Sequence, residues 1–222
     1  MPKFAAGVVR FQNEVFPQKQ DFFEELSHGQ SPEALFITCS DSRIETAMIT
    51  QTEPGELFIC RNAGNIVPPH TNQTGGMTAS IEFATAALRV PHIVVCGHTE
   101  CGAMKGAMHP EGLDALPQVK EWLSYSRAAT QVVAELGKDL SDGERMDMLL
   151  KQNVLLQLQH LKTHPSVAAR LAARDLVLHG WVYDIKTGGV EAYDEATDSF
   201  VSINARYAEE MARMASENTC AA

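Results

Sequence analysis

The sequence predicts an α/β protein whose central, largely parallel sheet is flanked by helices. Short apolar runs at 34–38, 56–61 and 92–97 are typical of buried strands. Segments with apolar residues at helical spacing alternate with these runs. Parallel strands need such long crossovers, because a tight turn cannot join them. With no internal repeat, low-complexity tract or linker, residues 1–222 are expected to form a single domain.

The N-terminal segment, about residues 1–28, is expected to be helical. Phe4, Val8, Phe11 and Val15 recur at helical spacing within 3–16. Pro17 is expected to end this helix, and 18–28 form a second helical piece. These helices carry more apolar surface than one subunit would cover, which predicts a dimer or larger assembly.

The other elements follow from the same patterns. After the first strand we expect a helical turn at 44–50, the second strand at 56–61, a loop rich in Asn, Gly and Pro at 62–76, an Ala-rich helix at 77–89 and the third strand at 92–97. In the second half we expect long helices at 117–136 and 143–163, a strand at 175–184, a hairpin turn at 186–189 and a tail from about 204 to 222 that is a polar helix or disordered.

Composition narrows the function classes. Eighteen Lys and Arg against 28 Asp and Glu give a formal net charge of −10, which argues against a nucleic-acid partner and against docking on anionic lipid. No apolar run approaches the ~18 residues of a membrane span. The short apolar stretch near the N-terminus is interrupted by Arg10 and lacks the features of a secretory signal, so a cytoplasmic protein is expected.

Chemistry-bearing residues follow two of the predicted strands. Cys39, Asp41 and Arg43 come directly after 34–38, and in extended backbone residues two apart point to one side. His98 and Cys101 follow 92–97, and at the start of a helix a spacing of three would place both on one face. If the two strands are parallel neighbours, all five groups meet at the carboxyl edge of the sheet, where open α/β sheets build their sites.

Two thiolates and one imidazole suit zinc. The fourth ligand is then either Asp41 or solvent. Arg43 bears on this choice, because a bidentate Arg–carboxylate pair can hold Asp41 beside the metal rather than on it. An open fourth position would give a bound water with a pKa near ~7.

At these residues the chain resembles the β-class carbonic anhydrases. The similarity covers nearly the whole chain and is densest in QSPEALFITCSDSRI, PGELFICRNAGNIVPP, GGMTASIEFATAALRV and HIVVCGHTECGAMKG, between Gln30 and Gly106. Among subgroups it looks similar to bacterial enzymes encoded with cyanate degradation, and also to the plant-type branch. The resemblance implies a β-carbonic anhydrase fold with an extended N-terminal helix, and a lyase of carbon utilization. Its reaction would be the reversible hydration of carbon dioxide to bicarbonate and a proton by attack of zinc-bound hydroxide.

The resemblance also assigns roles to residues. It implies one zinc ion per subunit, a homodimer that in some members pairs into a tetramer, and active sites at the subunit interface. Cys39, His98 and Cys101 match the metal ligands, Asp41 and Arg43 match the catalytic dyad, and Gln30, Phe58, Phe83 and Gly102 match the substrate pocket. Phe83 stands where plant enzymes have Tyr. Gly102 fits a need for backbone close to the metal site.

A further expectation concerns the state of the site. Some bacterial relatives close it by bringing the counterpart of Asp41 onto zinc, supported by a bicarbonate ion held by a Trp, an Arg and a Tyr. Arg61 and Tyr183 match the last two, but Phe36 replaces the Trp and lacks its N–H donor. We therefore expect an open site, with Asp41 paired to Arg43.

Three other functions compete. A structural zinc module would have no open ligand position, and a zinc hydrolase of the same fold could act on carbon disulfide or carbonyl sulfide. A thiol redox protein using Cys39 and Cys101 is disfavoured, because no C-x-x-C motif is present.

Overall fold

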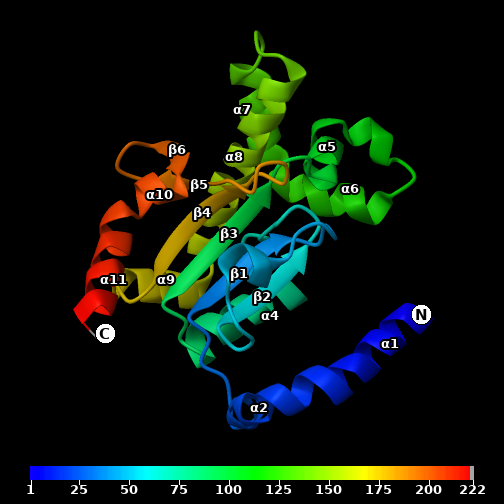
Figure 1. The fold of residues 1–222 in the computed structure, drawn as a ribbon. Helices are drawn as coiled ribbons and strands as arrows, with labels where there is room; N and C mark the ends of the chain where they lie inside the picture. Colours follow the sequence, from blue (N-terminus) through cyan, green and yellow to red (C-terminus); the bar gives the residue numbers. More distant parts are fainter. Residues whose placement is uncertain (221–222) are drawn as a thin grey trace.

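The computed structural model describes residues 1–220, which fold around a six-stranded sheet with helices packed against it (Figure 1). The strands are β1 (Ala34–Cys39), β2 (Leu57–Asn62), β3 (His92–His98), β4 (Val177–Tyr183), β5 (Val190–Asp194) and β6 (Ser199–Ser202). They lie in the order β2-β1-β3-β4-β5-β6. The first four pair in parallel, and β5 and β6 add antiparallel strands. The predicted α/β class and the hairpin after β4 are confirmed, whereas β6 was not predicted because its four residues are too few for a clear alternation.

The register places the ends of β1 and β3 at one edge of the sheet. β1 is central in the parallel part, with β2 on one side and β3 on the other. Thr38 pairs with Cys96, so Cys39 and the last residues of β3 emerge side by side. The expected meeting of the two motifs at the carboxyl edge is confirmed.

The N-terminal arm, residues 2–27, is nearly continuous helix. It comprises α1 (Pro2–Arg10), a π-helical turn (Phe11–Val15), a 3₁₀ turn (Phe16–Lys19) and α2 (Gln20–Ser27). The expectation that Pro17 ends the first helix is wrong: Pro17 occupies the first turn of the 3₁₀ segment, where its missing N–H leaves no hydrogen bond unmade. The arm (blue) extends away from the sheet in Figure 1, and Phe4 and Val8 are 69% and 56% exposed.

Further helices follow the N-terminal arm along the described chain. They are α3 (Thr46–Thr50), α4 (Gly76–Glu82) with a π-helical extension (Phe83–Ala87), α5 (Gly102–Met108), α6 (Pro117–Leu123), α7 (Arg127–Leu136), α8 (Asp142–Lys162), α9 (Pro165–Ala172), α10 (Ile203–Arg206) and α11 (Ala208–Cys220); 3₁₀ turns lie at Pro110–Leu113 and Ser124–Ser126. The helix expected at 117–136 is divided by the second of these turns. The helix expected to start near His98 begins only at Gly102, as α5. α9 was not predicted, because it spans only two turns. Residues 221 and 222 of the expected tail lie outside the described chain.

Among the described helices, the 21-residue α8 packs most extensively against the sheet. It begins at a capping box, in which Ser141 and Glu144 satisfy each other's backbone N–H groups. Its apolar face packs on β3 and β4. A Cβ at Gly180 would come 2.9 Å from Val154 Cγ1, so glycine allows α8 to lie this close to β4. Within residues 1–220, none of the helices is both long and apolar enough to cross a bilayer.

Candidate metal centre

Three metal-ligating side chains meet at the carboxyl edge of the sheet. Cys39 is the last residue of β1, His98 is the last residue of β3, and Cys101 is the N-cap of α5. Their donor atoms all lie within 4.8 Å of one another, and the three residues are buried. The two Sγ atoms are 4.0 Å apart. Sulfur ligands at tetrahedral zinc, each about 2.3 Å from the metal, lie about 3.8 Å apart, so the thiols already have nearly the required separation.

A tight turn, not a helix, brings His98 and Cys101 together. The expectation that a helical spacing of three aligns them is wrong, because His98 still belongs to β3 and Cys101 only precedes α5. Between them Glu100 has a φ of +57°, a left-handed conformation that reverses the chain. The Thr99 backbone N–H donates to Tyr183 O at 2.9 Å and fixes the turn to β4.

The His98 ring is oriented as a metal ligand. Its Nδ1 lies 2.8 Å from the carbonyl oxygen of Thr99. Because a carbonyl only accepts, Nδ1 carries the hydrogen and Nε2 keeps a free lone pair. Nε2 is buried and has no hydrogen-bond partner. A buried nitrogen lone pair beside two thiols, held by a hydrogen bond from the other ring nitrogen, fits a metal ion.

The two thiols titrate as a pair. The hydrogen bond from Cys101, together with that from the Gly64 N–H, lowers the pKa of Cys39 despite its burial. The interaction with Cys39, together with burial, raises the pKa of Cys101. Ionisation of one thiol thus disfavours ionisation of the other, and a bound cation would allow both to be deprotonated.

Asp41 is held by Arg43, as expected. The Arg43 side chain donates from Nε to Asp41 Oδ1 at 2.9 Å and from Nη2 to Oδ2 at 2.7 Å, and the Arg43 backbone N–H also donates to Oδ1 at 3.0 Å. These hydrogen bonds, the side-chain ones first, hold the pKa of Asp41 well below its usual range. Oδ1 therefore accepts two hydrogen bonds, while Oδ2 accepts one and lies 4.0 Å from His98 Nε2. The remaining acceptor capacity of the carboxylate is on the oxygen nearest the metal-ligating cluster.

Two arginines bind the site loops together. Arg43 Nη2 also donates to Glu100 O at 3.0 Å and thereby links the two motifs. Arg61, near the end of β2, donates from Nε to Cys39 O at 3.0 Å and from Nη2 to Asp41 O at 2.7 Å. Sequence reasoning missed this contact of Arg61, because the pairing of β2 with β1 that places it there is known only from the structure.

The loop after β2 also reaches the site, which the sequence analysis did not predict. The Gly64 N–H donates to Cys39 Sγ at 3.4 Å. Gly64 has a φ of +83°, and a Cβ there would lie 2.8 Å from Met104 Cε of α5. Only glycine fits this backbone conformation and this contact without strain.

Three of the four expected pocket residues lie away from the metal-ligating cluster within one chain. Phe58 pairs with Leu35, four residues before Cys39 and thus about 13 Å away along the strand. The rings of Phe58 and Phe83 are 6.0 Å apart. Gln30 lines a hollow of about 530 Å³ beside α2. Gly102 directly follows Cys101 at the start of α5, and a Cβ there would meet nothing within 4 Å.

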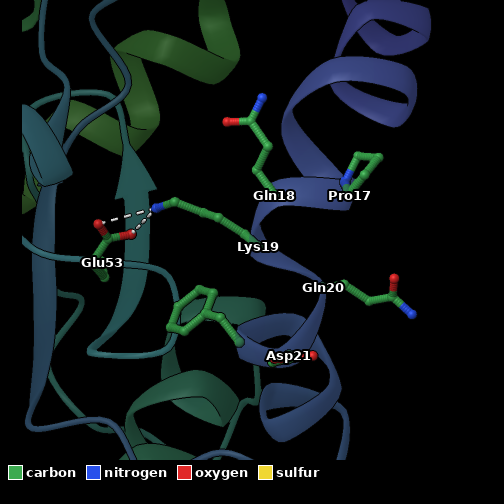
Figure 2. Close-up of a pocket in the computed structure, with 7 residues that line it drawn as sticks. Pro17, Gln18, Lys19, Gln20, Asp21 and Glu53 are labelled. Atoms are coloured by element: carbon green, nitrogen blue, oxygen red, sulfur yellow. Dashed lines mark hydrogen bonds and ion pairs between the residues drawn. The ribbon is translucent and has the colours of Figure 1, made fainter.

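A second hollow, of about 560 Å³, lies between the N-terminal arm and the loop before β2 (Figure 2). Pro17, Gln18 and Asp21 lie on its arm side, and Lys19 reaches across to Glu53, with Nζ–Oε distances of 3.2 and 3.0 Å. None of the three metal-ligating residues lines it. It is therefore not part of the candidate metal centre.

Known proteins similar to this chain in sequence and fold are carbonic anhydrases. The family model described as carbonic anhydrase matches residues 34–190. A carbonic anhydrase of Pseudomonas aeruginosa is 48% identical over 197 residues, covering 89% of each chain. The solved β-carbonic anhydrase CcaA is 43% identical, with a TM-score of 0.88 over 91% of this chain and 98% of that one. A tetrameric β-carbonic anhydrase of Sordaria macrospora is 34% identical, with a TM-score of 0.69 over 86% of this chain and 92% of that one.

Proposed function

From the premise that this chain belongs to the β-carbonic anhydrase family, we propose that it is a zinc enzyme that interconverts carbon dioxide and bicarbonate. The fold and the relatives support carbon dioxide hydration as the activity. The identity of the metal, its ligands and the roles of the neighbouring residues are the proposed part.

One observation carries the proposal: a buried Cys₂His set lies beside a carboxylate that Arg43 holds back. Cys39, His98 and Cys101 would hold the zinc ion. When bound, zinc lowers the pKa of a bound water to about 7 and so supplies a hydroxide nucleophile at neutral pH.

Asp41 and Arg43 would orient the nucleophile. With its pKa well below the usual range, Asp41 stays ionised near neutral pH and acts as a hydrogen-bond acceptor rather than as a general base. The free acceptor site on its Oδ2 faces the cluster and would fix the direction of the nucleophile's O–H bond. Arg43 keeps this carboxylate beside the metal position instead of on it.

The substrate pocket would be completed by a second subunit. Gln30, Phe58 and Phe83 lie away from the cluster within one chain, and Phe83 is 47% exposed. We therefore assign them to the site of the partner subunit in a homodimer, which in turn could pair into a tetramer. The two phenylalanines would supply the apolar wall that carbon dioxide needs, and the Gln30 amide would supply a donor for the developing negative charge. Gly102 would line the same pocket beside Cys101.

A carbon dioxide hydration assay across pH, on zinc-loaded and chelator-treated protein, tests the proposal. About one zinc ion per chain and activity that disappears with the metal would support it. Stoichiometric zinc without any hydration activity would instead indicate a structural zinc module. Hydrolysis of carbon disulfide or carbonyl sulfide with no action on carbon dioxide would favour a different substrate on the same fold. A connection to cyanate degradation and to the plant-type branch stays a prediction, which the neighbouring genes and a phylogeny would test.

A further inference from the structure

We propose that Trp122 is a positioning residue for the metal ligand Cys39 and acts through the peptide group between Ala63 and Gly64. The inference rests on the proposed function, because it concerns the thiolate that would bind zinc. It extends that function to a residue on α6 that does not itself touch the metal-ligating cluster.

The contact is a chain of two hydrogen bonds through one peptide group. Trp122 Nε1 donates to the carbonyl oxygen of Ala63 at 2.9 Å. The N–H on the other side of the same peptide group, that of Gly64, donates to Cys39 Sγ at 3.4 Å. Hydrogen bonds in such a chain polarise one another, so the indole N–H makes the Gly64 N–H a better donor to sulfur.

The loop that follows this peptide group is also held in place. Asn153 Nδ2 of α8 donates to Gly64 O at 3.1 Å, and Ser126 Oγ donates to Asn153 Oδ1 at 2.8 Å. Gln157 Oε1 accepts the Val67 N–H at 2.9 Å. Asn153, Gln157 and Ser126 are at most 1% exposed. The loop therefore has little freedom to turn the Gly64 N–H away from sulfur. The hydrogen bond from Trp122 further fixes the orientation of the peptide group that carries this N–H.

This hydrogen bond bears on the electronic character of the ligand. An N–H donor withdraws electron density from a thiolate and so reduces what the sulfur gives to a metal. Satisfying a buried carbonyl would by itself explain the Trp122 contact. A purely structural role, however, would leave the sulfur–metal bond unchanged, so measurements on that bond separate the two explanations.

The first experiment observes the hydrogen bond in the unmodified protein. The metal is replaced by cadmium-113, and the protein is labelled with [¹³C-carbonyl]alanine and [¹⁵N]glycine. The sequence contains only two Ala–Gly pairs, Ala63–Gly64 and Ala6–Gly7 in the N-terminal arm, so the second serves as an internal control. We expect the Gly64 N–H to show scalar coupling to cadmium-113 through the sulfur, and Gly7 to show none. Absence of the Gly64 coupling in cadmium-loaded protein overturns the proposal.

The second experiment removes the indole donor. Trp122→Phe keeps an aromatic ring and loses the N–H. Trp181→Phe is the matched control: Trp181 is the other tryptophan of the chain, and its Nε1 donates to Tyr207 Oη at 3.3 Å rather than to the site loop. In the cobalt(II)-substituted proteins, we expect the sulfur-to-cobalt charge-transfer band to shift to longer wavelength in Trp122→Phe and to stay at the wild-type position in Trp181→Phe.

The outcomes separate this inference from the proposed function. An unshifted band in folded, cobalt-loaded Trp122→Phe, or an equal shift in both variants, overturns the role of Trp122. If Trp122→Phe fails to fold, the coupling at Gly64 in the unmodified protein still decides whether the hydrogen bond to sulfur exists. Failure of the wild-type protein to bind zinc, cobalt or cadmium in stoichiometric amounts would instead contradict the proposed function.

Discussion

Replacing Arg43 by alanine is expected to remove most of the activity while leaving the metal in place. Arg43 makes two charge-assisted hydrogen bonds to Asp41, at 2.9 and 2.7 Å. These two bonds fix the position of the Asp41 carboxylate, and a displacement of about 1 Å of an orienting group lowers the rate by about 10²-fold. We therefore expect a fall in kcat/KM of roughly 100-fold.

The structure also indicates why the effect should not be larger. The backbone N–H of residue 43 donates to Asp41 Oδ1 at 3.0 Å and survives the substitution. The carboxylate thus keeps one tether, but its Oδ2 becomes free to take the fourth position on the metal. Arg43→Lys should fall between the wild type and the alanine variant, because lysine keeps the charge without the bidentate geometry.

Stopped-flow carbon dioxide hydration and elemental analysis on the same preparations measure both quantities. Arg89→Lys is the matched control for Arg43→Lys, since Arg89 pairs with Asp175 at 2.6 Å before the amino end of β3, opposite the metal-ligating cluster. Arg89→Lys should retain full activity. Wild-type activity in Arg43→Ala, or parallel loss of metal and activity, would refute the assignment of Arg43 as the group that holds Asp41.

Three further predictions concern the ligands, the arm and pH. Cys101→Ala is expected to lose zinc, measured by elemental analysis, together with its activity. Cys96→Ala is the control and should keep the metal, because it removes a buried thiol whose pKa desolvation raises to about 12. A zinc-loaded, active Cys101→Ala protein would show that Cys101 is not a ligand. Introducing glutamate at the exposed arm positions Phe4 and Val8 should shift the protein toward monomer in sedimentation velocity, and an unchanged assembly would contradict a role of α1 in association. Burial, and then repulsion by neighbouring positive charge, lowers the pKa of His179 to about 4 from 6.5, so the unfolded state binds the proton more tightly and stability falls as pH drops through this interval. The free energy of unfolding is expected to fall by about 2 kcal/mol between pH 6.5 and 5. Denaturant titrations of the wild type and His179→Phe should show a smaller fall in the variant.

The sequence predicts the sheet and the meeting of the two motifs well, for a physical reason. Apolar runs such as 34–38 are buried on both faces, which only a central strand of a parallel sheet requires. Once β1 and β3 are neighbours, Cys39 and His98 must emerge at the same edge. The pairing of Asp41 with Arg43 follows locally, because the two residues are only two apart.

Contacts that depend on distant partners could not be predicted. Asn153 and Gln157 appear in the sequence as polar residues interrupting the apolar stripe of α8, yet both are buried and bind the loop after β2. His164, the N-cap residue of α9, is only 2% exposed and donates from Nε2 to Pro68 O at 2.9 Å. Nothing in the local pattern shows that a loop about 90 residues away needs these donors and acceptors.

The same loop has a consequence for the order in which the protein is made. All three candidate metal ligands lie within the first 101 residues, but the anchors of the Gly64 segment lie on α8 and at the start of α9, up to residue 164. During synthesis at about 5–20 residues per second, the ligands emerge from the ribosome several seconds before those anchors do. We therefore expect a nascent chain to capture metal only weakly until α8 has docked on the sheet, and metal loading to be among the last steps of its maturation.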